Sequence, residues 1–111
     1  MARIKDDSYF IQKIIEDLAF IIENTGDISL AEFNENEVLQ DSMLFRFIQI
    51  SENVVKLSES FKSINNHIPW FSIKGLRNRV VHDYGNVDLT IVFDTIKFDV
   101  PELYRHLQDL K

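Results

Sequence analysis

The chain has 111 residues, of which 45% are hydrophobic and nine are Phe, enough for one packed core and too apolar for a disordered chain. It contains no Cys, which excludes disulfides, thiolate metal ligands and cysteine nucleophiles. Its net charge of −6 disfavours a nucleic-acid ligand, because phosphate backbones attract basic surfaces.

The first predicted element is a helix from about Ser8 to Asn24, in which isoleucines and a leucine recur at spacings of three and four. Asp7 or Ser8 can cap its start, and Gly26 is a natural stop. The segment Ser29-Leu30-Ala31-Glu32 reads as a capping box that opens a short helix.

A long helix is predicted from about Glu37 to Phe61. Its apolar face is wider than one neighbouring helix would cover, which indicates burial against several helices or across a dimer interface. The side chains on that face are Leu39, Met43, Phe45, Phe47, Ile48, Ile50, Val54, Val55 and Leu57.

The segment Ser63–Pro69 reads as a loop, and Pro69 suits the start of the next helix, from Trp70 to about His82 or Tyr84. After a turn at Gly85-Asn86, Asp88 can cap a fourth helix through about Lys97.

The segment Asp99-Val100-Pro101-Glu102 combines an N-cap, an early Pro and a reciprocal Glu, which predicts a fifth helix to the C-terminus. No segment alternates with a period of two. We therefore predict an all-α, up-and-down bundle of four main helices plus short ones, forming a single domain over 1–111. The polar, acidic start and the lack of an apolar run of ~18 residues predict a cytoplasmic protein without a signal peptide or membrane span.

The charges are unevenly distributed. Residues 1–60 carry twelve acids against five Lys and Arg, and residues 82–111 carry six against three. Residues 61–81 carry no acid but four bases, Lys62, Lys74, Arg77 and Arg79. This basic segment is either a phosphate-binding surface or a chance gap between acids.

Within the basic segment lies the pattern Arg77-x4-His82-x-Tyr84. On an ideal helix Arg77 and Tyr84 point within ~20° of each other, whereas His82 points ~140° away from Arg77. Asn78 is four residues from His82 and shares its face. Arg77 and His82 can converge only if the helix unwinds near His82, or if two copies of the motif face each other in a symmetric homodimer.

These side chains suit RNA cleavage without a metal. Arg77 can bind a phosphodiester and stabilise its transition state, while His82 can exchange protons with the ribose 2′-hydroxyl and the leaving oxygen. Asn78 would orient His82 or the phosphate. In the plainer alternative, Arg77 pairs with an acid on a neighbouring helix and His82 caps a helix end.

Other residues of the segment have two interpretations each. Lys74 and Arg79 are phosphate-positioning groups or members of surface salt bridges. Trp70 is a packing residue rather than a base-stacking one, because it opens the motif helix. Asp83 is a charge partner of His82 or a solvated residue. No combination of His67, His106 and acids has the spacing of metal ligands, so no metal site is predicted.

The motif and its surroundings resemble the HepT toxins of the HEPN superfamily. HEPN ribonucleases carry Arg, a polar residue, a few further residues and then His, here Arg77, Asn78 and His82, and the HepT form adds a Tyr, here Tyr84. The flanking pieces that match are Ile68-Pro69-Trp70, Gly75-Leu76, Val87-Asp88 and Val100-Pro101-Glu102-Leu103. One position departs from the pattern: the family usually has Gly-Glu where this chain has Ser51-Glu52. We expect Ser51 to change how closely helices approach without touching the chemistry.

The resemblance implies a homodimeric helical bundle whose paired motifs, with catalytic Arg77 and His82, form an RNA-cleaving cleft. It also implies an antitoxin partner, a minimal nucleotidyltransferase of the MntA type, which silences the toxin by transferring AMP from ATP onto Tyr84. ATP and Mg²⁺ would belong to that partner, so this chain needs no cofactor. Two alternatives stay open: a non-catalytic HEPN subunit that binds the nucleotidyltransferase or nucleotides, and a plain dimeric bundle.

Overall fold

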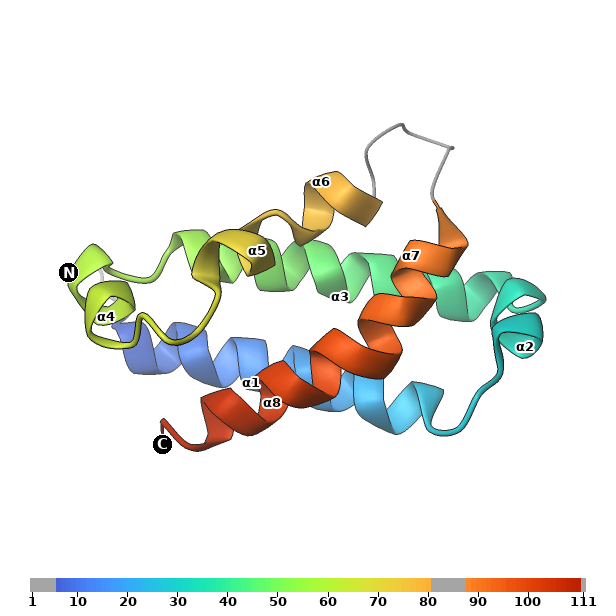
Figure 1. Ribbon diagram of the computed structural model, residues 1–111, viewed down its shortest axis with the longest axis horizontal. Helices are drawn as coiled ribbons and strands as arrows, with labels where there is room; N and C mark the ends of the chain where they lie inside the picture. Colours follow the sequence, from blue (N-terminus) through green and yellow to red (C-terminus); the bar gives the residue numbers. More distant parts are fainter. Residues whose placement is uncertain (1–5, 81–87, 111) are drawn as a thin grey trace, which may run out of the picture.

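The computed structural model describes residues 6–80 and 88–110, and within these ranges every regular element is a helix (Figure 1). The prediction of an all-α chain is confirmed. None of the described helices is long and apolar enough to cross a membrane. The elements are α1 Asp7–Thr25, α2 Leu30–Asn34, α3 Glu37–Val55, α4 Glu59–Ile64, α5 Trp70–Lys74, α6 Leu76–Val80, α7 Leu89–Asp94, the π-helix η1 Thr95–Asp99 and α8 Val100–Gln108.

Helix α1 is bounded by local hydrogen bonds. Its N-cap is Asp6, one residue before Asp7 and two before Ser8, the predicted caps, and the Asp6 carboxylate accepts from the Tyr9 N–H at 3.1 Å. Gly26 ends the helix as predicted: its φ is 45°, and its N–H donates to the Ile22 carbonyl at 3.1 Å. The Gly26 carbonyl then accepts from Lys97 Nζ at 2.9 Å, which ties the end of α1 to η1.

The capping box of α2 is confirmed. The Glu32 N–H donates to Ser29 Oγ, and the Ser29 N–H donates to Glu32 Oε1, both at 3.1 Å. The bond from the Ser29 backbone holds the pKa of the Glu32 carboxyl below its ordinary value, because it stabilises the charged form.

Helices α1 and α3 run side by side and supply much of the core, and η1 and α8 cross over α1 (Figure 1). Most of the apolar positions predicted to recur along α1 and α3 are buried, and burial of these faces stabilises both helices. Phe45 and Val55, which were predicted to widen the apolar face of the long helix, are each 55% exposed. The largest fully buried side chains are Phe33, Phe47, Ile14, Leu18, Ile21, Met43, Ile50, Ile68, Leu107, Val54 and Val92.

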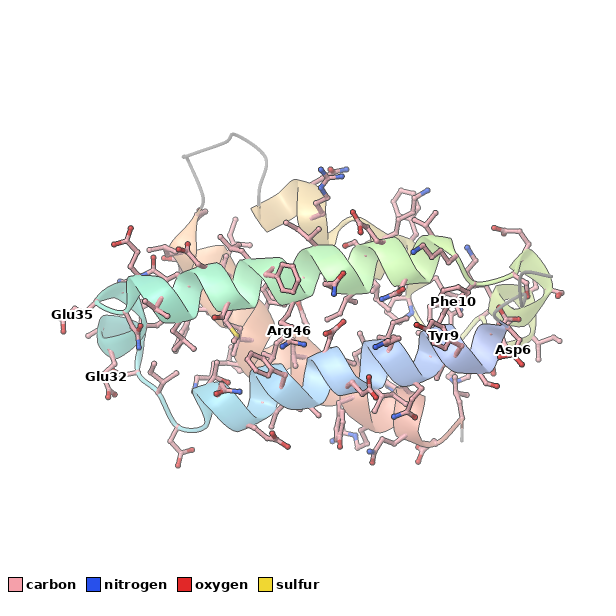
Figure 2. The ribbon with its side chains drawn as sticks, turned by 180° about the vertical axis from the view of Figure 1, so that it is seen from behind. Asp6, Tyr9, Phe10, Glu32, Glu35 and Arg46 are labelled. Atoms are coloured by element: carbon pink, nitrogen blue, oxygen red, sulfur yellow. The ribbon has the colours of Figure 1, made fainter. Side chains whose placement is uncertain are left out.

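An ion pair lies between α1 and α3 on the face seen in Figure 2. Arg46 Nη1 donates to Asp17 Oδ1 at 2.8 Å, and the Arg46 guanidinium carbon lies 3.8 Å from the centroid of the Phe20 ring. Asp17 is only 5% exposed. Burial raises the pKa of the Asp17 carboxyl, and the hydrogen bond and positive charge of Arg46 oppose that rise.

The predicted helix from Glu37 to Phe61 is wrong beyond Val55. The chain turns at 56–58, and Ser58 Oγ accepts from the Phe61 N–H at 3.2 Å to cap the separate helix α4. The cause lies far away in sequence: the Asp7 carboxylate accepts from the Ser58 N–H at 2.7 Å and from the Ser58 hydroxyl at 2.6 Å. Those bonds hold Ser58 at a helix start rather than inside a helix.

The predicted continuous helix from Trp70 is also wrong, because it breaks at Gly75 into α5 and α6. The Gly75 N–H donates to the Phe71 carbonyl at 3.1 Å and closes α5. On the α3 side, the Ser51 hydroxyl contacts the backbone on both sides of the break, at Ile73 and Arg77. This side chain supplies hydrogen bonds that a continuous helix would supply from its own backbone.

The predicted separation between a fourth and a fifth helix is wrong as well. Asp99 has helical backbone angles and makes no side-chain cap, and the chain runs from α7 through η1 into α8 without interruption (Figure 1). Pro101 has no N–H to donate to the preceding turn. The wider π-helical turn just before Pro101, with the Val100 N–H bonded to the Thr95 carbonyl, lets the helix pass this proline.

Candidate functional site

The candidate site begins where α5 and α6 lie along α3 (Figure 1). Ser51 on α3 is 4% exposed, and its Oγ donates to the Ile73 carbonyl at 3.2 Å and accepts from the Arg77 N–H at 3.3 Å. That Ser51 does not touch the chemistry itself stays a prediction, since both of its contacts are with backbone atoms. Ser51 holds the backbone of Arg77 and so fixes where its side chain starts.

The side chains of Lys74, Arg77 and Asn78 are exposed. Neither Lys74 nor Arg77 forms an ion pair with a residue of the described ranges. The plainer interpretation, in which an acid on a neighbouring helix neutralises Arg77, therefore finds no support among the described residues. An exposed guanidinium next to an amide can receive an anionic oxygen from solvent.

Lys62 differs from the other bases of the segment. Its Nζ lies 3.1 Å from Glu59 Oε1, and its side chain is 17% exposed. The carboxylate that neutralises it precedes the acid-free segment by two residues, so counting charges over residues 61–81 overstated the basic surface. Within the described part of the segment, the exposed cations are Lys74 and Arg77.

Several predicted site residues lie outside the described residues. These are the catalytic His82, the modified Tyr84 and the neighbouring Asp83, together with the side chain of Arg79. The convergence of Arg77 and His82 therefore remains a prediction. The described part of the motif does show that the helix break comes at Gly75, before Arg77.

The two aromatic residues at the start of α5 have opposite environments. Trp70 is 8% exposed, its indole N–H donates to the Asn65 carbonyl at 3.1 Å, and its ring packs 6.1 Å from that of Phe61. Its predicted packing role fits this environment. Phe71, by contrast, is 88% exposed. Sequence reasoning weighed the tryptophan and missed its neighbour, although Phe71 lies three residues before Lys74 in the acid-free segment.

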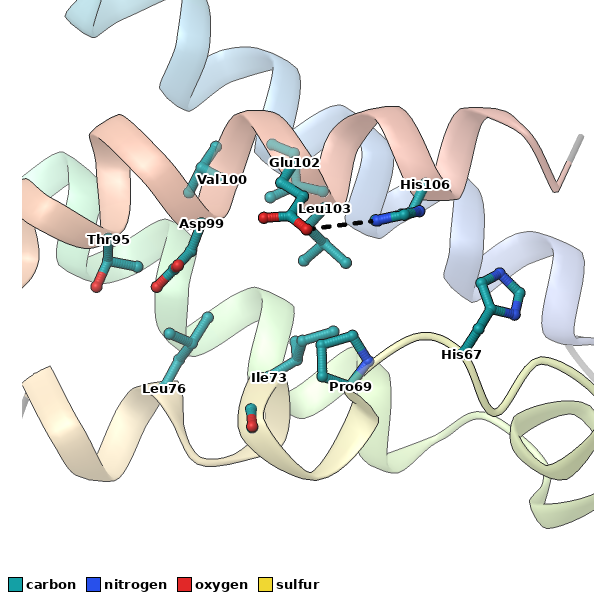
Figure 3. A pocket seen from close by; sticks show the side chains of 12 residues that line it. His67, Pro69, Ile73, Leu76, Thr95, Asp99, Val100, Glu102, Leu103 and His106 are labelled. Carbon is teal, nitrogen blue, oxygen red and sulfur yellow. Dashed lines mark ion pairs between the residues drawn. The ribbon is translucent and has the colours of Figure 1, made fainter.

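A pocket of about 420 Å³ opens between α5 and the η1–α8 helix (Figure 3). Leu18, Ile73, Leu76, Val100 and Leu103 line its apolar part, and polar side chains lie at its rim. There His106 Nε2 lies 3.7 Å from Glu102 Oε1, and the His67 and His106 rings are 6.2 Å apart. Lys74 and Arg77 do not line this pocket. Within residues 6–80 and 88–110, no cluster of His, Asp and Glu could hold a metal ion.

The described helices and the exposed Arg77-Asn78 pair are consistent with a helical domain of the HEPN-like class. A family model described as "Ribonuclease HepT-like" matches residues 14–110, and the chain therefore belongs to the HepT-like ribonuclease family. No solved structure matches the chain significantly.

Relatives with similar lengths support this assignment. The chain is 28% identical over 101 residues to a protein of Caldanaerobacter subterraneus subsp. tengcongensis named "Putative RNase", covering 91% of this chain and 90% of the relative. It is 26% identical over 106 residues to a protein of Methanocaldococcus jannaschii with the same description, covering 96% and 91%. It is also 26% identical over 102 residues to a "Probable ribonuclease HepT" of Thermococcus cleftensis, covering 92% and 93%.

Proposed function

We propose that this chain is the toxin of a HepT/MntA-like toxin–antitoxin pair and acts as a metal-independent RNA endonuclease. The observation that carries the proposal is the solvent-facing Arg77-Asn78 pair, held by Ser51 and free of ion pairs to described residues, in a member of the HepT-like ribonuclease family. An exposed guanidinium without a carboxylate partner has its N–H donors available for the oxygens of a phosphodiester.

In the proposed reaction, Arg77 binds the scissile phosphate, and Asn78 orients the phosphate or His82. His82 accepts the proton of the ribose 2′-hydroxyl as the 2′-oxygen attacks phosphorus. The bond from phosphorus to the 5′-oxygen breaks, and the leaving oxygen takes a proton from water or from a protonated His82. The products are a 2′,3′-cyclic phosphate and a 5′-hydroxyl. Arg77 stabilises the extra negative charge of the pentavalent transition state.

The proposed assembly is a symmetric homodimer in the cytoplasm, in which two copies of this single domain place their motifs across one cleft. Lys74 and Arg79 position the neighbouring phosphates. An MntA-like nucleotidyltransferase silences the toxin by transferring AMP from ATP onto Tyr84. The added phosphate would compete with RNA for the guanidinium of Arg77.

The test compares Arg77→Ala and His82→Ala with the parent in a cleavage assay on a single-stranded RNA in the presence of EDTA. We expect a loss of about 100-fold or more for each variant, because each removes transition-state stabilisation or proton transfer. Arg105→Ala is a matched control, since Arg105 is an exposed arginine on α8. A substrate with one 2′-deoxyribose at the cleaved position should resist all proteins. If both motif variants cleave as fast as the parent, the proposal is wrong.

The alternative is a non-catalytic subunit that binds a nucleotidyltransferase or nucleotides. The net charge of −6 and the neutralisation of Lys62 by Glu59 favour it, since both weaken attraction to RNA. A tight complex with such a partner, together with no RNA cleavage at any protein concentration, would support this alternative over the nuclease.

A further inference from the structure

The most exposed large apolar side chain of the described chain is Phe71, at 88%. It is flanked by buried residues, since Trp70 is 8% exposed and Ile73 is 4% exposed. Helix α5 therefore faces the core with two side chains and presents a bare aromatic ring to solvent. An exposed ring of this size leaves apolar area in water, which a ligand with a flat apolar face can cover.

The element under Phe71 is well anchored. The Ile73 carbonyl accepts from Ser51 Oγ at 3.2 Å, which links α5 to α3. The Phe71 carbonyl accepts from the Gly75 N–H at 3.1 Å, and the Ile73 N–H donates to the Pro69 carbonyl at 3.1 Å. The Phe71 ring is thus attached to a fixed backbone, which reduces the entropy lost when a ligand binds to it.

The charges near Phe71 in sequence suit a polyanion. Lys74 follows it by one helical turn, and Arg77 follows after the break, both exposed and without an ion pair to a described residue. No acid occurs from residue 61 to residue 81. An exposed aromatic ring followed by cations is the arrangement that binds single-stranded nucleic acid, because bases stack while phosphates meet the positive charges.

We propose that Phe71 is a stacking platform for one unpaired nucleobase of the RNA, next to a phosphate bound by Lys74 and Arg77. This inference deepens the proposed nuclease function and rests on it for the identity of the ligand. It specifies the substrate class as single-stranded RNA, since a base within a duplex has no free face to offer. Phe98, which is 70% exposed, lacks this setting, because Asp94 at the end of α7 and Asp99 at the end of η1 lie within four residues of it in the sequence.

The test measures RNA binding in the inactive His82→Ala background, so that cleavage does not consume the ligand. Fluorescence anisotropy follows a short single-stranded RNA and the same strand annealed to its complement. We expect Phe71→Leu and Phe71→Ala to weaken single-strand binding by about 5- to 100-fold, and Phe71→Trp to bind at least as tightly as Phe71. Duplex binding should be weak and insensitive to all three changes.

Two further comparisons make the outcome decisive. Phe98→Ala removes an equally large exposed ring and should leave RNA binding unchanged. If Phe71→Leu binds as well as the parent, stacking is excluded. If the Phe71 variants change the oligomeric mass but not RNA binding, the ring belongs to a protein interface. Absence of RNA binding by the parent also overturns the inference.

The nuclease proposal can fail separately. Phe71-dependent binding by a parent protein that cleaves no RNA would keep the stacking site and reject the catalytic function. Unchanged cleavage and binding in the Phe71 variants would keep the nuclease and reject the stacking site.

Discussion

Ser51 and Arg77 are 26 residues apart in sequence, yet the Ser51 hydroxyl accepts a hydrogen bond from the Arg77 N–H at 3.3 Å. The same oxygen donates to the Ile73 carbonyl at 3.2 Å. One buried hydroxyl on α3 therefore connects both sides of the break that precedes the candidate catalytic arginine. The fold around Arg77 depends on a side chain that takes no part in the proposed reaction.

Removing this hydroxyl should loosen the Arg77 backbone. We expect Ser51→Ala to lower the free energy of unfolding by about 1–3 kcal/mol, because a buried carbonyl and an N–H lose their partner. Amide exchange followed by NMR should show faster exchange of the Arg77 N–H than in the parent. The Gly26 N–H, which donates to the Ile22 carbonyl, is the control and should keep its rate. Unchanged exchange at Arg77 would show that Ser51 does not hold this segment.

The buried ion pair between α1 and α3 gives a second prediction. Arg46→Met should lower the free energy of unfolding by about 3 kcal/mol, because it leaves the Asp17 carboxylate buried without its partner. The double variant Asp17→Leu with Arg46→Met should recover most of that loss. Lys13→Met, which breaks an exposed pair with Glu16, should change stability by less than about 1 kcal/mol. Urea denaturation of the four proteins measures these differences. Equal losses for Arg46→Met and Lys13→Met would contradict the prediction.

The raised pKa of Asp17 predicts how the ion pair responds to pH. The folded state holds the Asp17 proton more tightly than the unfolded state, whose ordinary pKa is 3.8. The contribution of the Asp17 carboxyl to the free energy of unfolding is therefore fully present below pH 3.8. It is lost as the pH rises through the pKa of this carboxyl in the folded state. Relative to Asp17→Asn, which does not titrate, the parent should lose stability across that window and then stay level.

The same reasoning predicts that the cost of Arg46→Met grows with pH. Without Arg46, nothing offsets the burial of the ionised carboxylate. Thermal unfolding of parent, Asp17→Asn and Arg46→Met proteins at a series of pH values tests both statements. A cost of Arg46→Met that is the same at acidic and neutral pH would show that the guanidinium acts through packing alone.

Two glycines should respond oppositely to the same substitution. Gly26 has φ of 45° and open space where a Cβ would lie, so Gly26→Ala should cost about 1–2 kcal/mol through backbone strain alone. Gly75 has φ of −80°, and an added Cβ would lie 3.5 Å from the Phe71 carbonyl oxygen. That is an ordinary contact, so Gly75→Ala should stabilise the chain by about 0.4–1 kcal/mol through the unfolded state. Thermal unfolding of both variants measures whether each substitution raises or lowers stability. If Gly75→Ala destabilises the chain, the break between α5 and α6 requires glycine.

The sequence was most informative for structural features that depend on residues close together in the sequence. The capping box at Ser29 and Glu32 and the stop at Gly26 follow from local hydrogen bonds and backbone freedom, and both were predicted. The first helix and the start of α3 follow from the spacing of apolar residues. These rules need no knowledge of the tertiary fold.

The errors came where distant residues intervene. The end of α3 depends on Asp7 reaching Ser58, 51 residues away, and the break before Arg77 is bridged by Ser51. The continuous α7–η1–α8 helix depends on a π-helical turn that periodicity does not reveal. The packing of α5 likewise decides which of the adjacent residues Trp70 and Phe71 faces water. From the sequence, Trp70 was considered as a base-stacking residue, and Phe71, which is the exposed one, was missed.

The pairing of Lys62 with Glu59 has a consequence for how this protein would meet RNA. Each phosphate contact made by a cation releases condensed counterions, and the number of contacts sets how steeply affinity falls with added salt. With Lys62 paired to Glu59, the segment offers Lys74, Arg77 and the proposed phosphate-positioning residue Arg79, so each chain would release few ions. Ionic strength would then change RNA affinity only gently, and discrimination among RNAs would rest on shape and on the presence of unpaired bases.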